Sequence, residues 1–294
     1  MKLTKLHLPS IFTILSIFLI LVAKSSSFSI KTSNFAKHFL GAKKGDKIKG
    51  LDQVRQYLIK YGYMNSVWSD HQKEDFDYTL AQAIKKYQVF NHLNSSGILD
   101  ANTLAQMEMP RCGVPDFVNG TKIQHGRKLV IYGFNDSYYT FETTKWLKMN
   151  LTWALMPGTR ADAQRPIAAA MANWMSVSKF HFSQSPVFQN ADLQISFVSG
   201  EHGDRTRFDG PGGILAHSTF PPGGKLHFDA NETWVDGARA GAFDIGTIGL
   251  HEIGHLIGLG HSNVQSAIMW PIAPLGATKG LAPDDIAGIR ALYP

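Results

Sequence analysis

The sequence has little of three features that would otherwise narrow its function. Its 29 lysines and arginines are spread along the chain without a dense basic run, so we expect no nucleic-acid partner. After the N-terminal region no second long apolar stretch follows, and the closing "GIRALYP" does not resemble a lipid-anchor signal. Cys112 is the only cysteine, whereas a secreted domain usually carries an even number paired in disulfides. A solitary thiol in a secreted protein would need its own explanation.

The N-terminus has the pattern of a secretory signal peptide. Lysines come first, an apolar run extends from Ile11 to Ala23, and small polar residues follow, so we expect cleavage after Ser25. An uncleaved anchor is the alternative, but the run is shorter than the roughly 20 residues that a spanning helix needs. We therefore expect a secreted, extracellular protein without a stable membrane anchor. Four N-x-S/T triplets are candidate glycosylation sites, at Asn94, Asn119, Asn135 and Asn150.

The rest of the chain divides into a small helical domain over residues 26–109, a linker over 110–138 and a second domain over 139–294. Apolar residues at helical spacing predict one helix through Leu51 and Leu58 and another through Leu80 and Tyr87. Asp100 is a candidate N-cap for a third, which Pro110 would stop. The linker contains basic residues that a processing protease could reach.

The second domain mixes strands and helices. Strand patterns occur at "NLTWAL", "DLQISFV", "GGILAHS" and "KLHFD", and helical patterns at "RPIAAAMANWMSV", at the histidine-rich segment that contains "HEIGH" and at "APDDIAGIRALY". This order predicts an α+β fold. We found no internal repeat.

The histidine-rich segment carries the strongest chemical signal. In "HEIGHLIGLGH", His251 and His255 lie four residues apart and would project from one helix face. Alone, such a pair is more often two hydrogen-bonded core residues. Gly258, however, would let the helix end and the chain turn, bringing His261 back as a third ligand. Three neutral imidazoles leave one position of a tetrahedral zinc ion open for water, and Glu252 could take the proton of that water. The pattern therefore predicts peptide hydrolysis without a covalent intermediate.

With Met269 following it, this motif resembles that of the metzincin peptidases, and "PRCGVPD" resembles the cysteine switch of the matrix metalloproteinases, or matrixins. The resemblance covers nearly all of the mature chain. It implies a twisted five-stranded sheet with three helices, a structural role for Met269, and a helical prodomain similar to peptidoglycan-binding modules. It also implies that Cys112 occupies the catalytic zinc in a latent zymogen. The alternative for Cys112 is a buried thiol that acts only as a small apolar residue.

The same resemblance implies two further metal sites. A second, structural zinc would be bound by three histidines and one aspartate, namely His202, Asp204, His217 and His227. At least one calcium would be bound by the carboxylates of Asp209, Asp229 and Glu232 and the carbonyls of Gly210, Gly212 and Ile214. The alternative for the calcium loop is a solvated acidic turn. Lys225 stands where matrixins often have a calcium-binding aspartate, so we expect no more than this site from the resemblance. A glycan on Asn231 would crowd it, and we expect that triplet to be unoccupied.

Substrate recognition is also inferred from the resemblance. An extended peptide would pair with the strand containing Ala216, and a pocket beside Pro271 would accept an apolar side chain, with the small Thr247 at its floor.

The partners would be extracellular protein or peptide substrates and an activating protease, and we expect a monomer. No sequence remains for a hemopexin-like domain, and "GLDQVRQYLIKYGYM" resembles the plant branch, which would place the protein in the cell-wall space. The rival hypothesis is a non-enzymatic matrix-binding protein, but such a protein would not need Glu252.

Overall fold

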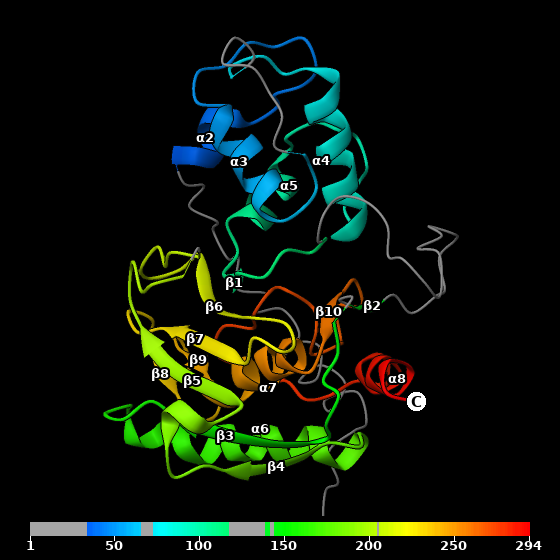
Figure 1. Ribbon diagram of the computed structural model, residues 1–294. Coiled ribbons are helices and arrows are strands. Elements are labelled where there is room, and N and C mark those ends of the chain that lie inside the picture. The colour runs from blue at the N-terminus through cyan, green and yellow to red at the C-terminus, as the bar shows by residue number, and fades with distance from the viewer. Residues whose placement is uncertain (1–33, 66–72, 118–138, 142–143, 205) are drawn as a thin grey trace, which may run out of the picture.

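The computed structural model describes residues 34–65, 73–117, 139–141, 144–204 and 206–294. A helical domain lies above an α+β domain, and the segment that contains Cys112 passes between them (Figure 1). The expected signal peptide, most of the linker, Asn119 and Asn135 lie outside the described residues. Among those described, no helix is long and apolar enough to cross a bilayer.

Among its described residues, the helical domain contains the three expected helices and one more. They are α3 (Asp52–Lys60), α4 (Tyr78–Phe90) and α5 (Ala101–Met107), preceded by the short α2 (Asn34–Phe39). The sequence prediction of three helices missed α2, because six residues are too few to show a periodic pattern. Asp100 caps α5 as predicted, since its side chain accepts a hydrogen bond of 2.8 Å from the Thr103 amide. Leu51, Leu58 and Leu80 are fully buried in the core between these helices.

The second domain is built on a mixed sheet whose order is β1-β6-β7-β5-β3-β4. Its strands are β3 (Asn150–Leu155), β4 (His181–Gln184), β5 (Leu193–Val198), β6 (Ile214–Ser218), β7 (Lys225–Asp229) and β1 (Arg111–Cys112). β6 pairs antiparallel with β7, and the other pairs are parallel. Five strands therefore come from this domain, as expected. The sixth, β1, comes from the segment that we had assigned to the linker.

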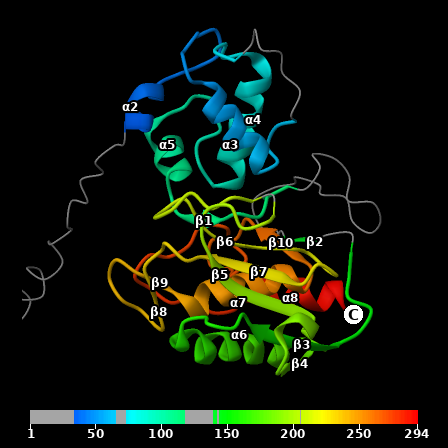
Figure 2. The ribbon, with the colours of Figure 1, turned by 60° about the vertical axis from the view of Figure 1, so that its left-hand side comes forward.

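Three helices complete the second domain: α6 (Gln164–Val177), α7 (Ile245–Leu256) and α8 (Pro283–Leu292). α7 lies under the sheet and packs against α6, as Figures 1 and 2 show from two sides. The Trp174 indole of α6 donates a hydrogen bond of 2.8 Å to the Leu250 carbonyl of α7. The two helices approach closely because Gly249 has no side chain, and a Cβ there would meet Ile167 Cδ1 at 2.6 Å. This packing fixes the position of α7 in the core.

Four short strands, each of two to four residues, form two small ladders outside the main sheet. β2 (Tyr139–Phe141) pairs with β10 (Leu259–Ser262), and β8 (Trp234–Val235) pairs with β9 (Phe243–Asp244). Short 3₁₀ turns occupy Ala161–Ala163 and Phe188–Asn190. Of these peripheral elements, β10 matters for the site because it follows α7 directly.

The helical domain and the α+β domain meet through side chains as well as through β1. Phe90 of α4 stacks on Trp270, with ring centroids 5.9 Å apart, and His92 donates a hydrogen bond of 2.6 Å to the Asn263 carbonyl. Trp270 is 8% exposed and belongs to the apolar core of the helical domain. The two domains are therefore docked through an apolar contact next to the segment 270–273.

Candidate metal centre

Helix α7 begins at a defined cap and carries two of the expected ligands. The Asp244 side chain accepts a hydrogen bond of 2.8 Å from the Thr247 amide. One turn later come His251 and then His255, both buried because α7 lies in the core. The helix ends before Gly258, whose φ of +102° is one that residues with a side chain rarely adopt. The chain then turns into β10, which returns His261 to the same point.

The three imidazoles present their Nε2 atoms to one another. The distances are 3.1 Å between His251 and His255, 3.2 Å between His255 and His261, and 3.3 Å between His251 and His261. Each Nδ1 lies 2.6–2.7 Å from an oxygen acceptor: Ile268 O for His251, Leu259 O for His255, and a carboxylate for His261. Each Nδ1 must therefore carry the proton, which leaves a lone pair on every Nε2.

These facing lone pairs fit a bound zinc ion. Donors around a tetrahedral zinc lie roughly 3.3–3.6 Å apart, given bond lengths of about 2.0–2.3 Å. Cys112 Sγ lies 3.5 Å from His255 Nε2 and completes a buried group of four whose donor atoms are within 4.8 Å of one another. Burial lowers the pKa of all three histidines, which keeps them in the neutral form that binds metal. The donor set, its spacing and its protonation all suit zinc.

The Cys112 side chain is held over the three histidines by the backbone on both sides of it. The Arg111 amide donates to Gly213 O at 2.8 Å, the Cys112 amide to Pro271 O at 2.9 Å, and the Gly113 amide to Ala216 O at 2.8 Å. Burial raises the pKa of the Cys112 thiol, and so does the nearby Glu252 carboxylate. A cation among the four donors would favour the thiolate instead. Cys112 Sγ is thus the fourth donor of the buried group.

Glu252 lies beside the four donors and is fully buried. Its Oε2 accepts a hydrogen bond of 2.8 Å from the Ser218 hydroxyl at the end of β6, while Oε1 has no hydrogen-bond partner. Burial raises the pKa of Glu252 to about 7, although the nearby Cys112 thiol and the hydrogen bond from Ser218 act in the opposite direction. A carboxyl group with a pKa near neutrality can both accept and release a proton at physiological pH.

A second carboxylate, Asp116, also reaches this centre. Its Oδ1 accepts hydrogen bonds from His261 Nδ1 at 2.7 Å and from Arg111 at 2.5 Å, and its Oδ2 accepts one from the Tyr63 hydroxyl at 2.6 Å. Burial alone would raise the pKa of Asp116, but the Arg111 guanidinium and His261 outweigh it and lower the pKa to about 2. Asp116 is therefore ionised in this structure at neutral pH.

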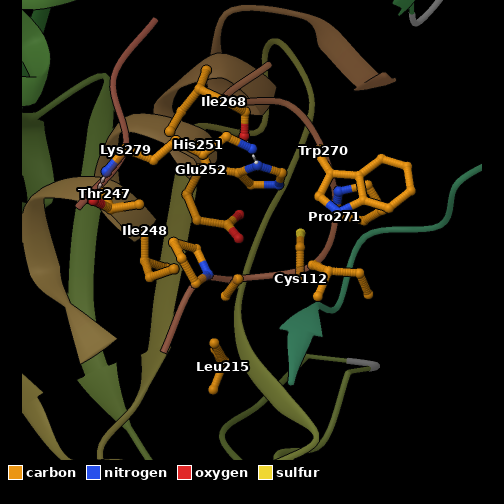
Figure 3. Close-up of a pocket in the computed structure, with 13 residues that line it drawn as sticks. Cys112, Leu215, Thr247, Ile248, His251, Glu252, Ile268, Trp270, Pro271 and Lys279 are labelled. Carbon is orange, nitrogen blue, oxygen red and sulfur yellow. Dashed lines mark hydrogen bonds between the residues drawn. The ribbon is translucent and has the colours of Figure 1, made fainter. Parts of the chain in front are cut away.

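A pocket opens beside the candidate zinc site. Figure 3 shows Cys112, Trp270 and Pro271 at one end and Thr247 and Lys279 at the other. Its wall is mainly apolar and includes Leu215, Ile248, Ile268, Ile272, Ala273 and Pro274. Of the expected recognition residues, Thr247 and Pro271 line this pocket, whereas Ala216 faces Cys112 across the β1–β6 pairing.

The remaining expected residue of the centre, Met269, packs against Gly254 of α7. Its side chain is 1% exposed, and a Cβ on Gly254 of α7 would meet its sulfur at 2.4 Å. Asp285 of α8 accepts hydrogen bonds from the Ile268 and Met269 amides at 2.8 and 3.1 Å. The turn at Met269 is thus fixed between α7 and α8.

The residues expected for a second zinc also meet. His202 Nε2, His217 Nε2 and His227 Nδ1 lie 3.1, 2.9 and 2.9 Å from Asp204 Oδ2. The His202 ring is further fixed because its Nδ1 donates to Gly200 O at 2.8 Å. Burial lowers the pKa of His217 to about 4, so this histidine is neutral at pH 7. Three histidines and a carboxylate can fill a tetrahedral zinc site completely and leave no position for a substrate.

The expected calcium ligands lie on two segments, one that leads into β6 and one that follows β7, which hydrogen bonds join. The carboxylates of Asp209, Asp229 and Glu232 accept hydrogen bonds from the amides of Ile214, Gly210 and Gly212 at 3.0, 3.2 and 2.5 Å. Within the described ranges, only the two histidine-containing groups bring three or more His, Cys, Asp or Glu side chains within 4.8 Å of one another. Burial raises the pKa of Glu232, and the neighbouring Asp229 and Asp209 raise it further, a cost that a cation would relieve. Calcium at this loop stays a prediction.

Sequence reasoning missed Asp116, Ser218 and Lys279 as members of the site. Asp116 stands in the quoted "PRCGVPD", but nothing in that motif indicates that it contacts His261. Ser218 ends a strand that was predicted for its apolar alternation. The Lys279 amide donates to Thr247 Oγ1 at 2.9 Å, and burial lowers the pKa of its side chain to about 8. Only the tertiary fold brings these residues to the centre.

Comparison with known proteins finds a matching family for each of the two domains. Residues 145–294 match the matrixin family and residues 49–107 match the putative peptidoglycan binding domain family. Metalloendoproteinase 1 of Glycine max is 41% identical over 85% of this chain and 83% of its own length. Metalloendoproteinase 2-MMP of Arabidopsis thaliana is 36% identical over 87% of this chain and 74% of its own length. The hatching enzyme of Paracentrotus lividus is also 36% identical, over 82% of this chain and 38% of its own.

Proposed function

Because the chain belongs to the matrixin family and is a zinc metalloendopeptidase, we propose that it is secreted as a latent zymogen that cleaves extracellular proteins after its prodomain is removed. The observation that carries the proposal is the meeting of Cys112 with His251, His255 and His261, all four buried. A thiol at this place would take the position that water needs for catalysis, as latency requires. The rival hypothesis, a non-enzymatic matrix-binding protein, does not account for the family match of residues 145–294.

In the mechanism that we propose, the three histidines hold the catalytic zinc and Glu252 moves the proton. Zinc, when bound, supplies a Lewis acid that makes water a nucleophile near neutral pH. The Ser218 hydroxyl occupies Glu252 Oε2, so the buried Oε1 is the oxygen that is available to accept a proton. Glu252 would then donate that proton to the leaving amine.

The substrate would take the place of β1. Once the segment 110–113 has left, the exposed edge of β6 and the Pro271 carbonyl can pair with an extended peptide. The pocket that ends at Thr247 would accept the apolar side chain after the scissile bond. Main-chain pairing would provide affinity for peptides in general, and the pocket would provide selectivity.

Latency and location complete the proposal. Cys112 would be released when a protease cuts within the linker, beyond the described residue Phe117, and the docking of Phe90 on Trp270 would hold the prodomain until then. Similarity to metalloendoproteinases of Glycine max and Arabidopsis thaliana supports the cell-wall space as the site of action. We further propose the second zinc at His202, Asp204, His217 and His227, one calcium at the loop of Asp209, and N-glycosylation at the exposed Asn94 and Asn150.

A peptide assay with a chelator tests the proposed chemistry. The processed protein should cleave a quenched peptide, and a zinc chelator should abolish this activity, with recovery after zinc is returned. Glu252→Ala should lower kcat by roughly 10²–10⁴-fold, because the proton acceptor is lost while the three histidines remain. Activity that persists in the chelator, or a Glu252→Ala enzyme as fast as the parent, would contradict the mechanism.

A further inference from the structure

The three histidines of the candidate zinc site differ in the group that accepts the hydrogen bond from their Nδ1 atom. The Nδ1 of His251 donates to Ile268 O and that of His255 to Leu259 O, and both carbonyls belong to the same domain as the histidines. The Nδ1 of His261 instead donates to the Asp116 carboxylate at 2.7 Å. Asp116 lies in the first part of the linker, on the segment that the proposed processing removes. One of the three imidazoles is therefore oriented by the prodomain.

We propose that Asp116 is a positioning residue for the zinc ligand His261, so that the prodomain strengthens zinc binding at the same time as Cys112 blocks the site. The inference rests on the proposed function, since it requires that His261 bind zinc. Its consequence is that the zymogen holds the catalytic zinc more tightly than it would through Cys112 and three unassisted histidines.

The chemistry of the contact supports this role. A carboxylate is a stronger acceptor than a carbonyl, and a hydrogen bond from Nδ1 to a carboxylate increases the basicity of the opposite ring nitrogen. In metalloproteins the loss of such an outer partner lowers metal affinity by about 10–100-fold. The side chains of His261 and Asp116 are both fully buried, so water does not compete for the hydrogen bond.

The prodomain holds Asp116 in place through several contacts. Arg111 pairs with Oδ1 and is itself only 2% exposed, and Tyr63 donates to Oδ2 at 2.6 Å. The Arg111 guanidinium also lies over the Tyr61 ring, 3.6 Å from its centroid. These contacts fix the carboxylate in one orientation, as a positioning role requires.

The test measures zinc affinity rather than activity. The full-length chain is prepared with Glu252→Ala to prevent self-cleavage, and zinc is titrated against a competing chelator in this parent, in Asp116→Asn and in the control Asp75→Asn. Asp75 is a prodomain carboxylate whose ion pair, with Lys47, is exposed to solvent and does not involve the histidines. Replacing zinc by cobalt provides the second readout, because a thiolate–cobalt absorption band reports whether Cys112 is still bound.

We expect Asp116→Asn to weaken zinc binding at the catalytic site by about 10–100-fold while the thiolate band remains, and Asp75→Asn to match the parent. An affinity equal to that of the parent would overturn the proposal. So would a loss of affinity together with loss of the thiolate band, because Asp116 would then serve only to dock the prodomain. A parent that binds no zinc at the three histidines would instead refute the proposed function.

A second variant keeps the proposal testable if Asp116→Asn does not fold. Tyr63→Phe removes one hydrogen bond to the Asp116 carboxylate and leaves both Asp116 and His261 in the chain. We expect a smaller loss of zinc affinity, about threefold to tenfold, because Tyr63 acts on His261 only through the Asp116 carboxylate. Unchanged affinity in a folded Tyr63→Phe chain would count against the positioning role.

Discussion

At the scale of single residues, the proposed latency depends on one sulfur atom. Cys112 Sγ is the fourth donor beside three imidazoles, and the Val114 amide donates to it at 3.3 Å. We expect Cys112→Ser to give an unprocessed chain that cleaves a quenched peptide, because a hydroxyl binds zinc more weakly than a thiolate and yields to substrate. The assay is run at early times, with mass spectrometry to verify that the chain is intact. A mutant as silent as the parent would show that latency has another source.

The size of Thr247 should set the depth of the pocket. Its side chain is 4% exposed, lines the pocket and accepts a hydrogen bond from the Lys279 amide. We expect Thr247→Leu to lower kcat/KM roughly tenfold for peptides with a long apolar residue after the cut bond, because the added methylenes fill the space. Thr247→Val is the matched control, since it removes the hydroxyl at nearly constant volume. Equal losses in the two variants would mean that the hydroxyl, and not pocket depth, is responsible.

At the scale of elements, the pairing of β1 with β6 determines how firmly the switch segment is held. Gly113 follows β1, and a Cβ there would meet Ile214 Cγ2 at 2.7 Å and His217 Cβ at 3.2 Å. We expect Gly113→Ala to push the segment away from β6, so that the zymogen is activated several times faster by a given amount of protease. Gly280→Ala is the control, because a Cβ at Gly280 meets nothing within 4 Å. An activation rate equal to that of the control would contradict the importance of this contact.

At the scale of the whole molecule, the chain has no disulfide, and bound ions would take over part of the stabilisation. Asp204 lies within 3.1 Å of three histidines, and we expect Asp204→Asn to reduce the zinc content from two ions per chain to one. A loss of about 2 kcal/mol would lower the Tm of a domain of this size by roughly 4–8 °C. Metal analysis and calorimetry check both effects. Asp236→Asn, in an ion pair with the exposed Arg165, should change neither.

Much of the secondary structure could be predicted because it follows from local patterns. The apolar spacing of α3 and α4, the Asp100 cap of α5 and the alternation in β5 and β7 all appear in the structure. β4 was missed because its residues are mostly exposed and show no alternation. β1 was assigned to the linker because two residues beside prolines carry no strand pattern, and its pairing with β6 is a tertiary contact.

The sequence alone determined the chemistry of this protein, because the spacing of His251, Glu252 and His255 on one helix and the turn at Gly258 are local properties that a motif can encode. It also identified the residues of the second histidine cluster, although their role as ligands stays a prediction. Only the tertiary structure decided that Asp116 contacts His261, that Ser218 contacts Glu252 and that Lys279 closes the pocket. Asp116 and His261 lie 145 residues apart in the chain, and Lys279 and Thr247 lie 32 apart. No local sequence pattern records a contact over such separations.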